Sequence, residues 1–307
     1  MINKLELQKY DIQEEIRRVA TEICNDGLEE LIVHSNPDEI VIHNTRKRIK
    51  FLRALLRLVK YDLDKVHYSS QNNFLRHIKN LSTNQREIIV LEKAVLQLLS
   101  TSTKNSTIAF LERVHSSVMA EKEIINREPT HEALVGRYQK LLQVYKNLIR
   151  EWPFSKKDLK QIITGMTVIY DSARRLLLQS RTSRDVHSLH DLRKRTKDLY
   201  HIFSVIVPAS TKEYRHTTIL LKKLSDILGD IHDLFAIPDF IEKVTPGVHD
   251  DPVFLKIKKR TQRKIDARID KALKLSDEVY KQTPYKFRMA VTRRLTRYSS
   301  KHFKPDF

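Results

Sequence analysis

The amino-acid sequence predicts an all-α protein, and three observations support this fold class. The 307 residues include only five glycines and nine prolines, which leaves little of the turn chemistry that a multi-stranded protein requires. Long segments rich in Leu, Ile, Lys, Arg and Glu favour helices. Two of these segments also repeat one another at a fixed spacing, so we expect an internal duplication that forms two helical lobes.

The composition limits the partners and the compartment of the protein. Lys and Arg number 57 against 38 Asp and Glu, a formal net charge of +19, and such an excess favours polyanionic partners. The single cysteine, Cys24, excludes an intramolecular disulfide and a Cys-rich zinc site, and we expect it to be a core residue in a reducing compartment. The sequence shows neither a secretory signal nor an apolar run of about 18 residues. We therefore expect a cytoplasmic protein that does not span a membrane.

The first helix is predicted from about residue 4 to residue 34, because apolar residues recur there at helical spacing. The next four residues, Asn36-Pro37-Asp38-Glu39, have the features of a helix start. Asn36 can cap the helix, Pro37 suits the first turn, and Glu39 follows three residues after the cap.

The second helix contains residues 42–60, IHNTRKRIKFLRALLRLVK, and combines a basic and an apolar stripe. Because each residue advances by about 100° on a helix, the apolar side contains Ile49, Leu52, Leu55, Leu56 and Val59. The other side, an arc of roughly 120°, carries a first basic strip of His43, Arg46, Lys47, Lys50, Arg53 and Arg57. An ordinary solvated face would place acids among such cations. A flexible polyanion would relieve their mutual repulsion.

The remainder of the first half is predicted to be helical, with short interruptions. A turn near residues 69–73 leads into a helix that ends near Leu81, and Ser82-Thr83 then opens another. The polar run 100–107 is typical of a loop. Trp152-Pro153-Phe154 is the expected boundary between the lobes, because proline disfavours helix in the residue before it. The later helices of this half are predicted over about residues 82–99, 108–125 and 130–151.

The second half repeats this order. Residues 190–203, HDLRKRTKDLYHIF, match HNTRKRIKFLRALL at an offset of 147 residues, which predicts a second basic strip of His190, Arg193, Lys194 and Lys197. Residues 183–185 can cap this helix, and Pro208 is expected to close it. Gly229 is expected to separate two helices, and Pro284 to start a short basic terminal helix. The other predicted helices of this half run over about 155–180, 211–228, 230–243 and 253–280.

The two His-containing helices, with the segments that follow them, resemble the conserved histidine α-helical domain family, abbreviated CHAD. The pattern of that family is a His followed at +3, +4, +7 and +10 by basic residues, and then by a short turn with Arg-Asp or His-Asp. HNTRKRIKFLR with STNQRE, and HDLRKRTKDLY with LGDIHD, match it in order and spacing. Tyr200 departs from the pattern where the first repeat has Arg53, and Glu87 stands where the family usually has Asp.

The resemblance implies a single domain over residues 1–307 that consists of two four-helix bundles related by pseudo-twofold symmetry. We place the N-terminal lobe at residues 1–152 and the C-terminal lobe at residues 153–307. The resemblance also implies that the basic strips line a shared groove that binds inorganic polyphosphate. No catalysis is implied, and we expect neither a metal site nor a cofactor.

Further residues complete the candidate site. Arg76 and Lys222 lie on the helices leading into the two turns, where an ordinary surface role is equally open. Arg174 and Arg175 in the 155–180 helix are also candidates.

The roles of the histidines and of two core-facing arginines are predicted separately. His43 and His190 are expected to contact phosphate and to be partly charged near neutral pH, with satisfied core histidines as the alternative. Arg48 and Arg195 occupy the core side of their helices, so we expect them to pair with acids of the turns, such as Glu87 and Asp233.

Two rival functions come from other classes. The pairs His190-Asp191 and His232-Asp233 loosely resemble those of metal-dependent phosphohydrolases, but a divalent metal needs converging carboxylates or neutral imidazoles, and His190 has cationic neighbours. A nucleic-acid-binding module is permitted by the charge and ranks second, because neither strip carries a row of aromatic residues for base stacking. We therefore expect a polyphosphate-binding protein that is not an enzyme. Recruitment to polyphosphate stores and a scaffold role are both open.

Overall fold

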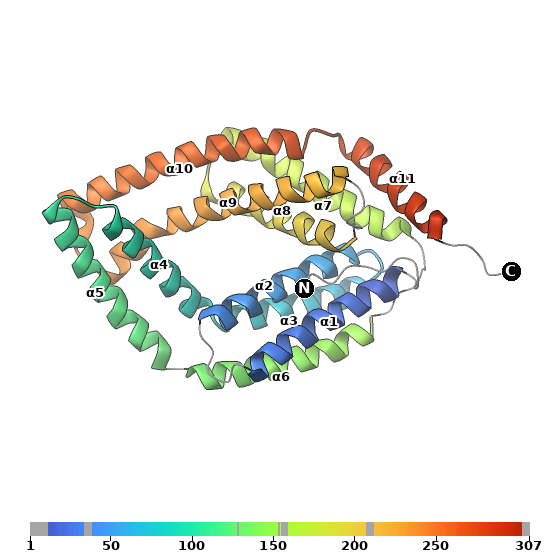
Figure 1. The fold of residues 1–307 in the computed structure, drawn as a ribbon, viewed down its shortest axis with the longest axis horizontal. Helices are drawn as coiled ribbons and strands as arrows, with labels where there is room; N and C mark the ends of the chain where they lie inside the picture. Colours follow the sequence, from blue (N-terminus) through green and yellow to red (C-terminus); the bar gives the residue numbers. More distant parts are fainter. Residues whose placement is uncertain are drawn as a thin grey trace.

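The computed structural model describes residues 12–33, 39–127, 129–152, 154, 159–206 and 212–302. Within these ranges the chain forms eleven α-helices, one short 3-10 helix and no strand. The predicted all-α class is therefore confirmed (Figure 1). None of the described helices has the length and apolar character that a membrane span requires.

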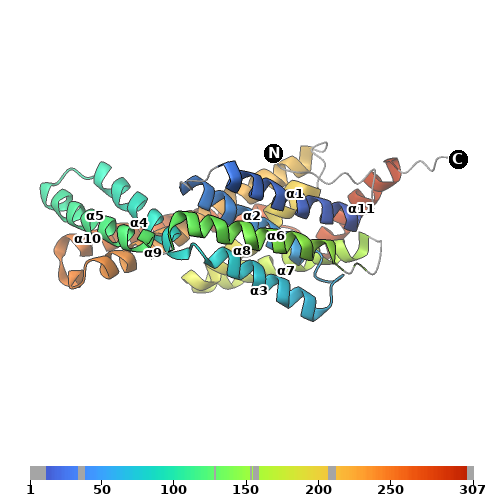
Figure 2. The ribbon, with the colours of Figure 1, turned by 90° about the horizontal axis from the view of Figure 1, so that it is seen from below.

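Four helices of the first half pack together, and two form a projecting hairpin. Helix α1 packs on α2 and α6, and α3 packs on α2 and α6. Helices α4 and α5 pack on each other and extend toward one end of the elongated molecule (Figures 1 and 2). The bounds are α1 Ile12–Val33, α2 Glu39–Leu58, α3 Lys65–Asn80, α4 Thr83–Ser100, α5 Asn105–Arg127 and α6 His131–Arg150.

The helices of the second half form a second layer, which includes the long helices α9 and α10. Helix α8 packs between α7 and α9, α10 lies along α9, and α11 packs on α7. Helix α10 begins 147 residues after α5, the same offset that relates the basic strips of α2 and α8 in the sequence. The bounds are α7 Leu159–Ser183, α8 Val186–Ile206, α9 Lys212–Val244, η1 Val248–Asp250, α10 Pro252–Val279 and α11 Pro284–His302.

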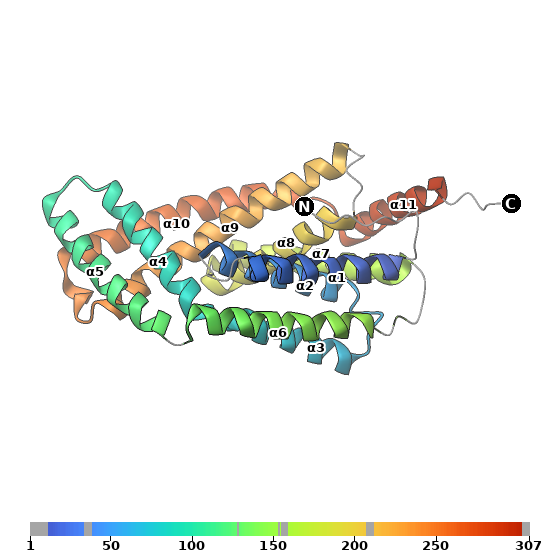
Figure 3. The same ribbon diagram turned by 60° about the horizontal axis from the view of Figure 1, so that its bottom comes forward.

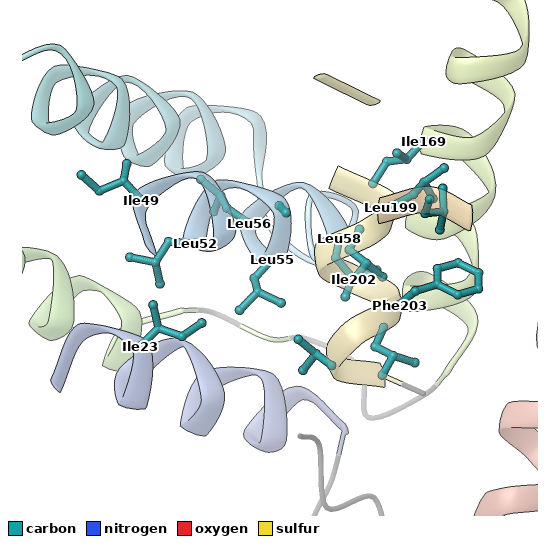
Figure 4. Packing of buried hydrophobic residues seen from close by; sticks show 14 of the residues in the cluster. Ile23, Ile49, Leu52, Leu55, Leu56, Leu58, Ile169, Leu199, Ile202 and Phe203 are labelled. Carbon is teal, nitrogen blue, oxygen red and sulfur yellow. The ribbon is translucent and has the colours of Figure 1, made fainter. Parts of the chain in front are cut away.

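The larger apolar core is shared by both halves of the chain. Leu52 and Leu55 of α2 and Ile202 of α8 are almost fully buried in it, and Figure 4 shows α2 packed between Ile23 of α1 and the side chains of α8. Helix α7 also approaches α2 very closely. A Cβ atom added to Gly165 would lie 2.2 Å from the backbone oxygen of Leu58, so only glycine fits at this crossing.

A second, smaller core lies at the end of the molecule that carries the α4–α5 hairpin (Figure 3). Val95 of α4 and Leu111 of α5 pack there with Ile241 of α9 and Phe254 of α10. The hairpin is therefore buried against the turn between α9 and α10, which comes more than a hundred residues later in the chain.

Two predicted breaks in the helices are wrong. Residues 69–73 lie within α3, which begins earlier, because the Asp64 side chain accepts from the backbone N–H groups of Val66 and His67 and caps the helix there. Helix α9 continues through Gly229 and also through Pro238. Gly229 serves close packing instead of a break, since an added Cβ would lie 3.4 Å from Nη2 of Arg193.

Two expected helix starts are confirmed. Helix α4 starts at Thr83. The Asp185 carboxylate accepts from the N–H groups of His187 and Ser188 and so caps α8. Cys24 is buried in the core, where burial raises the pKa of its thiol to about 12. The predicted helix start at 36–38, the first residues of the predicted 4–34 helix and the stop at Pro208 lie outside the described residues.

Candidate polyanion-binding site

The two basic strips face a common region because α2 packs on α8. Lys50 lies at the centre of this region, where Arg193, Arg46, Lys197 and Arg86 repel its ammonium group. Lys47 in turn repels His43 and Lys197. We call Arg46, Lys47, Lys50, Arg86, Arg193 and Lys197 the central basic cluster.

Keeping Lys50 protonated in the folded protein costs free energy. Burial lowers the pKa of Lys50 to about 7, and the surrounding cations add to this shift. In the described part of the chain, Lys47, Lys50, Arg193 and Lys197 form no ion pair with a carboxylate. Burial also lowers the pKa values of Arg193 and Lys197. Such a cluster has the charge and the shortage of partners that suit an incoming anion.

Three arginines of the first strip are partly used within the protein. Arg46 Nη1 donates to the carbonyl oxygen of Lys79 at 2.6 Å and to Ser82 Oγ at 3.3 Å. Arg53 Nε donates to Asn72 Oδ1 at 3.2 Å, and burial lowers its pKa to about 10. Arg57 donates to a buried carboxylate of α8, Asp198. These arginines therefore also hold α3 and α8 against α2.

The second strip is less uniformly basic than the first. The guanidinium of Arg193 lies against Gly229 of α9, near the carboxylates of Asp233, Asp226 and Asp230. Lys194 is exposed and pairs with Asp191 at 2.8 Å. The Lys197 ammonium lies 5.1 Å from the centroid of the Tyr200 ring, an arrangement that favours the cation.

The histidines at the heads of the strips are in different environments. The rings of His190 and His232 are 4.5 Å apart, and burial followed by the neighbouring His232 lowers the pKa of His190 to about 4. The Nδ1 atoms of both rings are buried and make no hydrogen bond to any described residue. Burial and Arg86 lower the pKa of His43, although its side chain lies at the surface. His190 is therefore neutral at pH 7 in the free protein, so the expectation of partial charge is wrong for this residue, whereas for His43 it stays a prediction.

The expected partners of Arg48 and Arg195 are wrong. Arg48 pairs with Glu30 of α1 instead of Glu87. Arg195 Nη1 donates to Asp198 Oδ2 at 3.2 Å, within its own helix, instead of pairing with Asp233. Glu30 lies on the neighbouring helix α1, and Asp198 lies one turn away on α8 itself, so neither arginine needs to reach the turn.

The structure brings two of the four additional candidates close to the strips. Arg76 contributes to the repulsion felt by Arg53 and Lys79. Lys222 pairs with Asp226 at 2.9 Å and also repels Lys197.

The other two candidates have their contacts elsewhere. Arg174 Nε donates to the carbonyl oxygen of Tyr280 at 3.1 Å. Arg175 pairs with Asp171 one turn away on α7, at 2.6 Å. The structure thus does not join Arg174 and Arg175 to the central basic cluster.

Two cations of the site were not among the predicted residues. Arg86 of α4 repels Arg46, Lys50 and Arg193 and so lies between the two strips. Lys79 at the end of α3 is repelled by Arg46 and Arg53, and burial lowers its pKa. Arg86 stands in the STNQRE segment that matches the CHAD turn, so this motif was the available signal. Lys79 carries no comparable signal.

A cavity of about 590 Å³ opens beside the central basic cluster, between the start of α2, α4 and the middle of α9. Both acidic and basic side chains line this cavity, and Glu39 pairs there with Lys93 at 2.9 Å. Within the described residues, no group of three His, Cys, Asp or Glu side chains could hold a metal ion. The charged residues and His43 in the lining are Glu39, His43, Arg86, Lys93, Asp230, Asp233 and Arg268.

The fold and the site together define an all-α helical-bundle domain with a cluster of converging cations between two of its helices. A model of the CHAD domain family matches residues 26–242, a range that contains both strips. The chain therefore belongs to the CHAD domain family, which is linked to polyphosphate binding. No curated protein matches the chain.

Proposed function

We propose that this protein binds inorganic polyphosphate, without catalysis, in a basic groove between the α2 and α8 strips. The observation that carries this proposal is the environment of Lys50. Cations from α2, α4 and α8 surround it, and no carboxylate pairs with it in the described part of the chain. Folding these cations together costs free energy, and a chain of phosphates relieves that cost.

The chemistry of the cluster matches a repeating anion. Arginines give planar, two-point contacts to phosphate oxygens, and lysines act as point charges. Arg86, Arg193, Lys47 and Lys197 therefore offer several successive contacts to one flexible chain. The acids near Arg193 make the α9 side of the groove less favourable than the α3–α4 side, where Lys79 and Arg76 lie.

We also propose that the two lobes are related by a pseudo-twofold repeat. The 147-residue offset that α5 and α10 share with the sequence repeat of α2 and α8 supports it, as does the similar packing of α1 on α2 and of α7 on α8. The groove is then a shared site at the contact of the lobes. We further propose that the protein is cytoplasmic and associates with polyphosphate stores.

The proposal excludes hydrolysis as the main activity. The neighbours of His190 are His232, Lys194 and Arg193, and such cations oppose the binding of a divalent metal.

The experiment compares two half-site variants with a matched control. Lys47→Glu/Lys50→Glu alters the first strip, and Arg193→Glu/Lys197→Glu alters the second; Arg46 is left unchanged because it also holds α3. Arg137→Glu/Lys140→Glu on the exposed face of α6 applies the same change in net charge elsewhere. Each half-site variant should weaken binding of long polyphosphate by about tenfold or more, while the control changes it far less.

The remaining outcomes separate the alternatives. Circular dichroism must show unchanged helical content in all three variants. Near wild-type affinity in both half-site variants would refute the groove. Tighter binding of single-stranded RNA or DNA than of polyphosphate at the same salt would favour a nucleic-acid module. Release of phosphate in the presence of Mg²⁺ that disappears in His190→Ala would favour an enzyme.

A further inference from the structure

One face of α10, outside the proposed groove, is basic. Lys256, Lys259, Arg260 and Arg263 follow the spacing i, i+3, i+4, i+7, so they share one side of the helix. All four side chains are exposed. None of them forms an ion pair within the described residues.

Two other cations of α10 are paired. Lys258 lies 3.5 Å from Glu242, and Arg268 lies 3.7 Å from Asp230. Lys264, Lys271 and Lys274 also form no ion pair within the described residues, so most cations of α10 are left without a carboxylate partner.

The equivalent face of α5 shows that this arrangement is not a general property of the outer helices. Helix α5 also packs on the end of α9 and begins 147 residues before α10. The corresponding positions carry Ala109, Glu112, Arg113 and Ser116, a mixed surface typical of a solvated helix. The four cations therefore distinguish α10 from its counterpart.

The basic face of α10 is continuous with the site. Lys264 is repelled by both Arg260 and Arg268, so it lies between them. Arg268 in turn lines the cavity that also contains His43 and Arg86. Cations, interspersed in the cavity with Glu39, Asp230 and Asp233, thus extend from the central basic cluster to the outer side of α10.

We propose that the basic face of α10 is a second contact for the same polyphosphate chain that occupies the groove, reached through this cavity. The proposal rests on the proposed function of the groove. It follows from charge complementarity and from the continuity of cations between the two surfaces. Short oligophosphates occupy the groove alone, whereas a long chain contacts both surfaces and gains affinity from the second one.

The test is a chain-length series with two triple variants of equal charge change. Lys259→Glu/Arg260→Glu/Arg263→Glu removes the α10 face, and Arg137→Glu/Lys140→Glu/Arg150→Glu on α6 is the control. For long polyphosphate, the α10 variant should lose roughly tenfold in affinity relative to the control. Its salt dependence should fall by about two to three units of slope, as expected when contacts to a polyanion are removed. For tripolyphosphate, the two variants should bind equally.

Three results would overturn the proposal that α10 provides a second contact. Equal affinities of the two variants for long chains would show that α10 is an ordinary solvated face. An equal loss for tripolyphosphate and for long chains would show a general electrostatic effect. Loss of binding to vesicles containing phosphatidylserine, with polyphosphate binding intact, would assign the face to membranes instead. Failure of the wild-type protein to bind polyphosphate of any length would instead refute the groove itself.

Discussion

The guanidinium of Arg57 on α2 donates to the carboxylate of Asp198 on α8 at 2.8 Å, although 141 residues separate them in the chain. Asp198 is buried and also accepts from Arg195. Burial raises the pKa of Asp198, and the two arginines oppose this shift. The ion pair thus fastens the two strip-bearing helices to one another.

Removal of this carboxylate should destabilise the fold. Asp198→Ala leaves Arg57 with no carboxylate at this position, and breaking a buried pair in this way costs about 3 kcal/mol. Asp191→Ala on the same helix removes an exposed pair with Lys194 and should cost less than about 1 kcal/mol. Urea denaturation of both variants measures the difference. Equal stabilities of the two variants would show that the Arg57–Asp198 pair does not hold α2 on α8.

Two glycines should respond in opposite directions to substitution by alanine. Gly165→Ala forces a methyl group against the Leu58 carbonyl, so α7 must move away from α2, at a cost of about 2–3 kcal/mol. Gly136 lies in α6, and no atom of the described residues is near its Cβ position, so Gly136→Ala should stabilise the protein by about 1 kcal/mol. Thermal unfolding of the pair tests the close crossing. A stabilised Gly165→Ala variant would contradict it.

Substitution of Lys50 by methionine should raise the stability of the protein and weaken its binding of polyphosphate. Lys50→Met keeps the apolar stem and removes a charge that burial and four cations disfavour. We expect a gain of about 1 kcal/mol at pH 6, where Lys50 is protonated, together with weaker polyphosphate binding. Lys140→Met, at an exposed position of α6, should change neither quantity appreciably. Lower stability of Lys50→Met would show that the charge of Lys50 is compensated in the free protein.

The pKa of Lys50 also predicts how binding depends on pH. In the free protein this group loses its proton near pH 7, and a bound phosphate chain favours the protonated form. The pKa therefore rises on binding, and a proton is taken up between pH 7 and the new pKa. Affinity should fall as pH rises above 7, by up to about tenfold per pH unit.

Titration calorimetry at pH 8 in two buffers of different ionisation enthalpy measures this proton uptake. Lys50→Arg is the matched variant, because its guanidinium stays charged throughout this range. It should bind without a comparable pH dependence. A wild-type affinity that is constant between pH 7 and 9 would contradict the assignment to Lys50.

The stability of the free protein should also depend on the protonation of Lys50, but it should rise with pH. Lys50 has a lower pKa in the folded chain than in the unfolded chain, so unfolding takes up a proton between pH 7 and about 10.4. Its unfavourable contribution is complete below pH 7 and disappears as pH rises through this window.

Helical periodicity predicted the parts of the fold that depend on local sequence. Ile49, Leu52, Leu55 and Leu56 are buried as the apolar stripe of α2 indicates. The break at Gly229 could not be excluded from the sequence, because a glycine favours a break unless another side chain needs the space. That side chain is Arg193, which comes from a different helix.

The residues of the site could likewise be predicted only where they depend on spacing along one helix. The residues of each strip follow from spacing along one helix, but the approach of Arg86 and Lys79 depends on how α3 and α4 pack on α2. The partners of Arg48 were mispredicted for the same reason. Glu30 is close to it only because α1 lies alongside α2, and periodicity does not specify which helices become neighbours.

The second core also has a consequence for synthesis of the chain. Val95 and Leu111 of the α4–α5 hairpin are covered by Ile241 and Phe254, which leave the ribosome about 140 residues later. At a synthesis rate of about 5–20 residues per second, the apolar side of the hairpin stays exposed for roughly 7 to 30 seconds before α9 and α10 can pack on it. Contacts of such long sequence separation also form slowly. We therefore expect the hairpin to be the part of the nascent chain that depends most on protection by chaperones.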